Sequence, residues 1–246
     1  MGGDSLRLKI LCHLSSEEFP LDYRRKIMMI IKKGMKREYP TIFADLYGQN
    51  TQKNFTFSVY FNHPTFEDDL IKVKDKTCII NFSTGEAELA IVFFNIFTLL
   101  KGENIKITEN VDLKIHSVEV IPVRKIKNNI IKFKTLSPIV IRDHNQITQK
   151  DWFYTLEEDE AIMILKRNMI GKLAAKDYGE SIEKEIKNIQ IKPLKFKKTV
   201  VRFYKMQIAT SLGEYEIKAS PRLLNILIQN GIGTFTGNGF GMIEQL

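Results

Sequence analysis

The feature that most limits the fold is a change of hydrophobic period that occurs in a similar order in both halves of the chain. In the first half, alternating apolar and polar residues predict strands, and apolar residues three or four positions apart predict helices. The expected strands are residues 6–14, 55–61, 78–82 and 111–122, and the expected helices are residues 21–38 and 84–102. The predicted order is therefore strand, helix, strand, strand, helix, strand.

The second half approximates the same order, although the two halves share no obvious sequence similarity. Its expected strands are 130–135, 139–141, 189–191, 200–209, 214–218 and 240–244, and its expected helices are 157–178 and 221–230. Each half thus reads as βαββαβ, the plan of the ferredoxin-like fold. We predict an α+β protein of two tandem ferredoxin-like domains, residues 1–123 and 124–246, a length that suits two small domains.

Five glycines lie within eleven residues near the C-terminal end: Gly231, Gly233, Gly237, Gly239 and Gly241. Because glycine has no Cβ, such a run lets backbone N–H groups approach a phosphate, or another backbone segment, closely. No Lys-Ser or Lys-Thr pair follows, which excludes a Walker loop. Five residues follow Gly241, too few for the helix that receives a pyrophosphate in a dinucleotide-binding fingerprint.

The charge of the chain indicates which kind of anionic partner the protein binds. The formal net charge is +8 and the isoelectric point is about 9.3. A positive excess of this size favours a polyanionic partner, most often nucleic acid. Lys-rich surfaces are also common in soluble proteins of AT-rich or thermophilic genomes, so charge alone leaves that alternative open.

One predicted strand region combines cations with aromatic residues. Its basic residues are Lys192, Lys195, Lys197, Lys198 and Arg202. This mixture suits phosphate contacts and base stacking. The alternative is a solvated edge strand on which lysines prevent aggregation. The aromatic consensus of RNA-recognition motifs is missing, so the pattern does not decide between the two interpretations.

Other sequence features indicate where the protein resides and whether it binds a metal ion. The longest apolar stretch, Leu89–Leu100, is about half the length that a bilayer requires. The first ten residues show no secretory signal. Cys12 and Cys78 are isolated, so we expect a reducing compartment and no zinc site. By elimination, we predict a cytoplasmic protein without metal or cofactor.

Four stretches, in order along the chain, carry a family resemblance. The glycine run is similar to the glycine-rich signature of the RAMP superfamily. Residues 53–58 (Lys-Asn-Phe-Thr-Phe-Ser), 133–139 and 152–154 (Trp-Phe-Tyr) are similar to further family segments. Together they make the chain resemble the CRISPR-associated repeat-RNA endoribonucleases, the Cas-six family.

The resemblance implies a function. Such proteins bind a CRISPR repeat in a basic groove between two ferredoxin-like domains and process pre-crRNA without metal. The 2′-OH attacks the adjacent phosphate, which leaves a 2′,3′-cyclic phosphate and a 5′-OH. The implied partners are repeat RNA and crRNA, with CRISPR effector-complex subunits and a second copy of the chain as further candidates.

The resemblance also implies catalytic positions. The chemistry needs a base, an acid and a cation, which relatives take from the first long helix, the following loop and a lysine before the second strand. These positions match Lys32, Tyr47 and Lys53, and Tyr47 stands where a histidine is expected. A tyrosine with a pKa near ~10 is a weaker acid than histidine. We expect Lys53, close by, to lower that pKa.

The first predicted helix is rich in cations. Helical spacing places Arg25, Lys32 and Lys36 on one stripe beside the apolar face. A solvated polar face is the usual reason for such a run. The excess of cations over acids in this helix instead favours contact with the RNA backbone.

The four histidines, His13, His63, His116 and His144, all lie outside the predicted helix and loop of the catalytic region. We interpret them as structural or surface residues, with His13 the one candidate for the cleft. Three hypotheses follow for the chain: a metal-independent endoribonuclease, a relative that binds repeat RNA with little or no cleavage, and a ferredoxin-like scaffold or metabolite-binding protein. The last explains neither the charge nor the glycine run.

Overall fold

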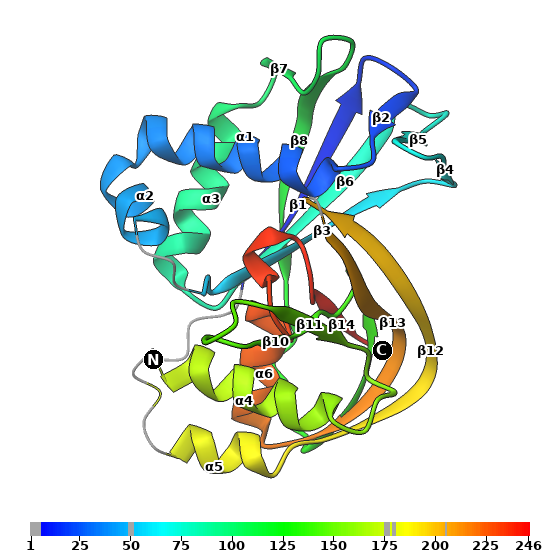
Figure 1. Cartoon of the computed structure of the whole chain (residues 1–246). Coiled ribbons are helices and arrows are strands. Elements are labelled where there is room, and N and C mark those ends of the chain that lie inside the picture. The colour runs from blue at the N-terminus through cyan, green and yellow to red at the C-terminus, as the bar shows by residue number, and fades with distance from the viewer. Residues whose placement is uncertain (1–5, 49–51, 175–177, 179–180, 205) are drawn as a thin grey trace. The chain divides into compact units, whose positions relative to one another are not determined.

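The computed structural model describes residues 6–48, 52–174, 178, 181–204 and 206–246 (Figure 1). The chain divides into two compact units, one ending at Val123 and the other beginning at Arg124. Each unit is built on one main antiparallel sheet, and each is described below by itself. Among the described residues, no helix is long and apolar enough to cross a membrane.

The main sheet of the first unit follows the ferredoxin-like order. Its strands are β1 (Leu6–Leu14), β3 (Phe55–Phe61), β6 (Thr77–Thr84), β7 (Asn104–Lys106) and β8 (Asp112–Pro122). They lie in the order β3-β6-β1-β8-β7, with every neighbouring pair antiparallel. Without the short β7, this is the second, third, first and fourth strand of a βαββαβ unit, so the predicted plan is confirmed.

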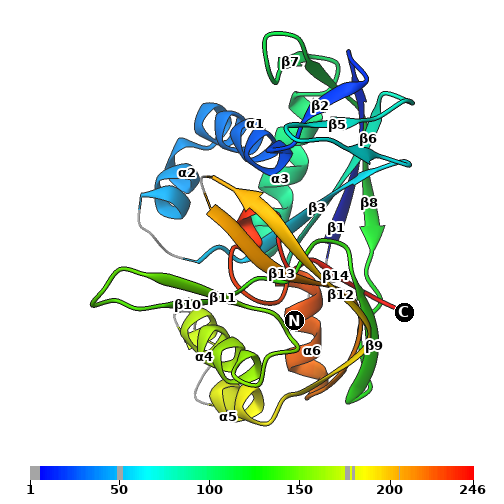
Figure 2. The same cartoon turned by 45° about the vertical axis from the view of Figure 1, so that its right-hand side comes forward.

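Two helices cover one face of this sheet, as Figures 1 and 2 both show: α1 (Tyr23–Glu38) and α3 (Ala87–Leu99). Between them and the sheet lies an apolar core in which Phe82 contacts Phe93, with ring centroids 4.0 Å apart. The two helices approach closely at Gly34, where an added Cβ would lie 2.5 Å from Ile96 Cγ2. Glycine at this position lets α1 rest directly on α3.

Three parts of the first unit were not predicted from the sequence: the short strand β7 and the two features that follow. A short helix, α2 (Pro40–Tyr47), follows α1 directly. A small sheet forms from β2 (Glu18–Pro20), β4 (Thr65–Phe66) and β5 (Leu70–Lys72), in the order β2-β5-β4. These strands have two or three residues each, too few to show a period of two in the sequence.

The second unit repeats the same strand order. Its main sheet contains β9 (Ile130–Thr135), β12 (Gln190–Phe203), β13 (Met206–Lys218) and β14 (Ile243–Gln245). They lie in the order β12-β13-β9-β14, again the second, third, first and fourth strand. The ferredoxin-like plan therefore occurs twice in the chain, as the sequence predicts.

The described part of the second unit contains three helices: α4 (Ala161–Ala174), α5 (Ser181–Lys187) and α6 (Pro221–Asn230). The bounds of α6 agree with the predicted 221–230, because Ser220 caps the helix by accepting a hydrogen bond from the Leu223 N–H and proline occupies the first helical position. A separate hairpin, β10 (Ile141–His144) with β11 (Asp151–Tyr154), precedes α4. A short 3-10 turn, η1 (Thr236–Asn238), lies within the glycine run.

Three sequence predictions for this unit are wrong. Of the strand predicted at 139–141, only Ile141 belongs to a strand, β10. The strand predicted at 200–209 spans a hairpin turn, because β12 ends at Phe203 and β13 begins at Met206. Tyr204 makes that turn in the left-handed region (φ 53°), a conformation rare for tyrosine, so no usual turn residue marks it. The helix predicted at 157–178 begins only at Ala161, and its described part ends at Ala174.

Candidate functional site

The three predicted catalytic residues come together in the first unit around one aromatic ring. The Lys32 Nζ lies 4.7 Å from the centroid of the Tyr47 ring, and the Lys53 Nζ lies 5.3 Å from the same centroid. Both distances lie within the range of cation–π attraction. Residues 15 and 6 positions from Tyr47 in sequence therefore meet at one point, which we call the two-lysine site.

Local structure explains how Tyr47 reaches this place. It is the last residue of α2 rather than part of a loop, so the loop expected from the sequence is wrong at this residue. Pro40 occupies the first turn of α2, and the Gly48 N–H donates to the Ala44 carbonyl at its end. Phe43, one helical turn before Tyr47, packs on its ring with centroids 5.1 Å apart.

The two lysines are fixed by neighbours that lie in the core. Lys32 follows the buried Ile31 on α1 and is itself exposed. Lys53 precedes the buried Asn54, whose Nδ2 donates to Glu86 Oε1 at 2.7 Å. The Thr84 hydroxyl donates to the Asn54 carbonyl at 2.6 Å. The backbone beside Lys53 is thus held by the end of β6 and the start of α3.

The hydroxyl of Tyr47 behaves differently from the sequence prediction. Burial raises the pKa of Tyr47 well above its usual value, because desolvation disfavours the phenolate. The expected lowering of this pKa by Lys53 is therefore wrong. The Tyr47 Oη is buried and has no hydrogen-bond partner within the described part of the chain. A hydroxyl in this state is a poor proton donor for a leaving group.

The pKa of Lys53 moves in the opposite direction. Burial lowers it, and the neighbouring positive charge of Lys32 lowers it further. A larger fraction of Lys53 is therefore an uncharged amine near neutral pH than in an isolated lysine. An amine with a lowered pKa can accept a proton, as a general base requires.

The remaining predicted cations of α1 are exposed. Arg25 Nη1 forms an ion pair with Asp22 Oδ2 at 3.3 Å. Lys36 lies one turn beyond Lys32 on the same side of the helix. These residues extend the positive surface of α1 from the two-lysine site along the helix.

The basic strand predicted in the second unit is β12, which lies at the edge of its sheet. All five of its predicted RNA-contacting residues are exposed: Lys192, Lys195, Lys197, Lys198 and Arg202. Alternate residues on one face include Phe196 and Val200, which are 45% and 63% exposed. Lys198 Nζ also pairs with Glu157 Oε2 at 2.7 Å. This edge presents apolar side chains between cations, as single-stranded nucleic acid requires.

The glycine run forms a folded segment, residues 231–242, that the chain itself holds in place. The N–H groups of Gly231, Gly239 and Gly241 donate to the carbonyls of Leu227, Thr236 and Pro138. These three glycines therefore shape the segment, and their N–H groups are occupied. Direct contact of a backbone N–H with a phosphate stays a proposal for Gly233 and Gly237.

Close backbone contacts explain why two of these positions need glycine. An added Cβ at Gly233 would lie 2.4 Å from the Val140 carbonyl oxygen, and one at Gly241 would lie 1.9 Å from the Ile232 carbonyl oxygen. Both residues also have positive φ. The alternative that the sequence left open, a backbone packed across the glycines, is thus present at these two positions.

The histidines lie outside the two-lysine site. His13 and His116 contact each other edge to face, with centroids 5.0 Å apart. His144 Nδ1 lies 2.8 Å from Asp151 Oδ1, which also accepts a hydrogen bond from Arg142 Nε at 2.7 Å. Sequence reasoning missed this cluster, because β11, which brings Asp151 opposite His144, was not predicted as a strand.

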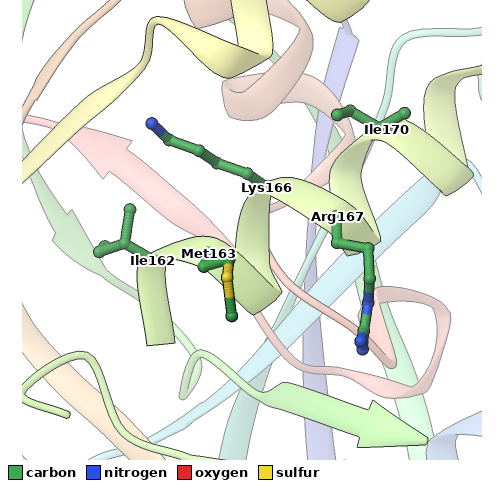
Figure 3. Close-up of a pocket in the computed structure, with 5 residues that line it drawn as sticks. All are labelled: Ile162, Met163, Lys166, Arg167 and Ile170. Atoms are coloured by element: carbon green, nitrogen blue, oxygen red, sulfur yellow. The ribbon is translucent and has the colours of Figure 1, made fainter. Parts of the chain in front are cut away.

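A shallow groove lies on the outer face of α4, lined by Ile162, Met163, Lys166, Arg167 and Ile170 (Figure 3). None of the predicted site residues lines it. Its cations already have partners: Lys166 Nζ donates to the Lys187 carbonyl, and Arg167 Nη2 donates to Asp143 Oδ1. Within the described residues, no cluster of three or more His, Cys, Asp or Glu side chains could hold a metal ion.

A family model matches the second half of the chain. Residues 121–245 match the family model described as "CRISPR associated protein Cas6, C-terminal". No curated protein matches the chain.

Solved structures share the fold over nearly the whole chain. A structure described as "Characterization of a Cas6-related gene from Pyrococcus furiosus" is 20% identical, has a TM-score of 0.84 and is matched over 98% of both chains. "An RAMP protein binding different RNA substrates" is 20% identical, with a TM-score of 0.83 over 98% of this chain and 99% of that one. A third structure, "CRISPR associated protein Cas6", is 19% identical, with a TM-score of 0.74 over 99% of this chain and 100% of that one.

Proposed function

The chain belongs to the family of the CRISPR-associated protein Cas6, and from this premise we propose that it binds CRISPR repeat RNA and cuts it at the two-lysine site. The family is known for binding and processing repeat RNA. The observation that carries the proposal for this chain is the meeting of Lys32 and Lys53 on the ring of Tyr47.

Two kinds of surface support RNA binding. The exposed cations of α1 and β12 suit phosphate contacts, and Phe196 on β12 offers an exposed ring for stacking. The proposed RNA contacts are therefore Arg25 and Lys36 on α1 and the basic residues of β12, with Gly233 and Gly237 of the glycine segment.

The proposed reaction uses the two lysines in different protonation states. The uncharged amine of Lys53 accepts the proton of the 2′-OH, whose oxygen attacks the adjacent phosphorus. The bond from phosphorus to the 5′-oxygen breaks, and the ammonium of Lys32 donates a proton to that oxygen. The products are a 2′,3′-cyclic phosphate and a 5′-OH. The same ammonium stabilises the negative charge of the phosphorane.

In this mechanism Tyr47 acts through its ring rather than its hydroxyl. The ring attracts the ammonium of Lys32 and lies beside the amine of Lys53, which places both side chains at the scissile phosphate. Tyr47 is thus a positioning residue.

One observation favours a second candidate function, binding of repeat RNA without cleavage. The residue at the position of the expected histidine carries a buried hydroxyl with a raised pKa, so an efficient acid is missing there. In that case the two lysines contact a phosphate and no bond breaks.

Incubation of the purified chain with end-labelled repeat RNA in EDTA distinguishes the two functions. We expect cleavage in EDTA, mapped to one phosphodiester, and no cleavage when the nucleotide before that phosphate is 2′-deoxy. Lys53→Ala is expected to slow the reaction about 100-fold, the size of a lost general base. Lys74→Ala removes an exposed lysine of the same unit and serves as the matched control, with an unchanged rate.

Tight, salt-sensitive binding of the RNA without any cleavage product would contradict the nuclease function and support the binding function. Weak binding that is insensitive to salt would exclude both functions. Cleavage of the 2′-deoxy substrate would contradict attack by the 2′-OH while leaving the RNA-binding proposal intact.

A further inference from the structure

A buried lysine of the second unit has no place in the proposed reaction. Lys172, on α4, is 7% exposed. Its Nζ donates to the Asn230 carbonyl at 3.2 Å and to Thr236 Oγ1 at 3.0 Å. Lysine is among the residues least often buried, and buried lysines are normally paired with a carboxylate. Here both acceptors are neutral, so neither offsets the cost of burying an ammonium.

Burial has the expected effect on this amine. It lowers the pKa of Lys172 to about 7, because desolvation disfavours the charged form. A lysine at this position costs stability whenever it is protonated, and an apolar side chain of similar length would avoid that cost. Its presence therefore requires a reason other than stability.

The two acceptors of Lys172 lie at special points of the chain. Asn230 ends α6, where the last carbonyls of a helix lack partners within the helix and carry partial negative charge. Thr236 begins the 3-10 turn η1, directly after Phe235, which has a left-handed backbone (φ 58°). One amine thus joins the start of the glycine segment to its middle.

Backbone hydrogen bonds hold the base of the segment, and the Phe235 ring packs beside Phe203, with ring centroids 5.6 Å apart. The Ile232 N–H donates to the Gly241 carbonyl and closes the base, and the Thr234 N–H donates to the Val140 carbonyl. Past this base, Lys172 links the side chain of Thr236 to α4.

We propose that Lys172 is a positioning residue whose buried amine holds the turn of the glycine segment in the conformation that receives the RNA backbone. This inference rests on the proposed RNA binding. It assigns Lys172 to affinity rather than to chemistry, because its contacts are to α6 and the glycine segment.

The test combines three variants with a matched control. Lys172→Met removes the amine and keeps the length of the side chain. Thr236→Val removes one acceptor at nearly constant shape, whereas Thr236→Ser keeps it. Lys166→Met is the matched control, since Lys166 lies on the same helix with its amine on the surface.

We expect Lys172→Met to raise the Kd for repeat RNA about tenfold. The free segment is then less well ordered for binding, and the loss corresponds to about one hydrogen bond. The rate of single-turnover cleavage at saturating RNA stays unchanged. The unfolding temperature stays unchanged or rises, because a buried amine is replaced by an apolar chain. Thr236→Val follows the same trend in affinity, and Thr236→Ser and Lys166→Met bind as the wild type does.

An unchanged Kd for Lys172→Met overturns the inference. So does a parallel loss of affinity and unfolding temperature, which indicates a merely structural role. Amide hydrogen exchange separates this inference from the proposed function. If the wild type fails to bind RNA, the proposed function fails, whereas faster exchange at residues 232–240 in Lys172→Met than in Lys166→Met still supports the positioning of the segment.

Discussion

Tyr47 shows that the sequence can indicate which residues meet without indicating the direction in which a pKa shifts. Its position beside Lys32 and Lys53 agrees with the prediction. The direction of its pKa shift does not, because burial of the hydroxyl outweighs the nearby positive charges. Sequence spacing indicates which residues meet, but desolvation depends on what covers them.

The ring of Tyr47 is the subject of a first prediction. Tyr47→Phe keeps the aromatic face, so we expect an unchanged cleavage rate. Tyr47→Leu keeps bulk but removes the ring that attracts the Lys32 ammonium and lies beside Lys53, and we expect a rate about tenfold lower. Single-turnover kinetics with saturating RNA measure both. If the Phe variant were as slow as the Leu variant, the hydroxyl of Tyr47 would take part in the reaction, contrary to the proposal.

Lys172 gives a prediction for the dependence of stability on pH. The unfolded chain holds this proton up to pH 10.5, whereas the folded protein releases it at about pH 7. Between these values the unfolded state binds more protons, so this residue makes stability rise with pH by about 1.4 kcal/mol per unit. Urea unfolding of wild type and Lys172→Met from pH 6 to 9.5 measures the difference. Parallel stability profiles for the two proteins would refute the shift.

At the level of elements, the main strands and helices of both βαββαβ units follow from the sequence. The residues of β1 alternate over most of its length, and α6 carries both a cap and an initial proline. The elements that were missed, such as β2, β4 and β5, are short and are stabilised by pairing with distant residues rather than by local pattern. The turn at Tyr204 lacks the residues that usually mark turns, so the sequence pattern predicts one strand where β12 ends and β13 begins.

The glycine segment and α4 provide a matched pair of glycine substitutions. Gly241→Ala places a Cβ 1.9 Å from a backbone oxygen at a residue with positive φ, and we expect a loss of about 3 kcal/mol. Gly171→Ala lies inside α4 with no atom within 4 Å of the added Cβ, and we expect a gain of about 0.5–1 kcal/mol. Chemical denaturation measures both. Equal effects of the two substitutions would contradict the backbone contact.

For the whole molecule, the net charge of +8 matters through its distribution, because the exposed cations of β12 lie together at the edge of a sheet. Each phosphate neutralised on a single strand contributes about 0.7 to the slope of log K against log salt. Replacing Lys195, Lys197 and Arg202 by Ala is expected to lower that slope by about 2. The control replaces Lys74, Lys101 and Lys106, which are exposed in the first unit. An equal change in the control would indicate nonspecific attraction.

The two-lysine site also has a consequence before any RNA arrives. Two amines that share one ring repel each other whenever both are protonated, and an anion between them relieves that repulsion. Such a site attracts small multivalent anions as well as a phosphodiester. We therefore expect sulfate to inhibit cleavage competitively and more strongly than chloride at equal ionic strength. The choice of buffer anion then sets how much of the protein is available to bind RNA.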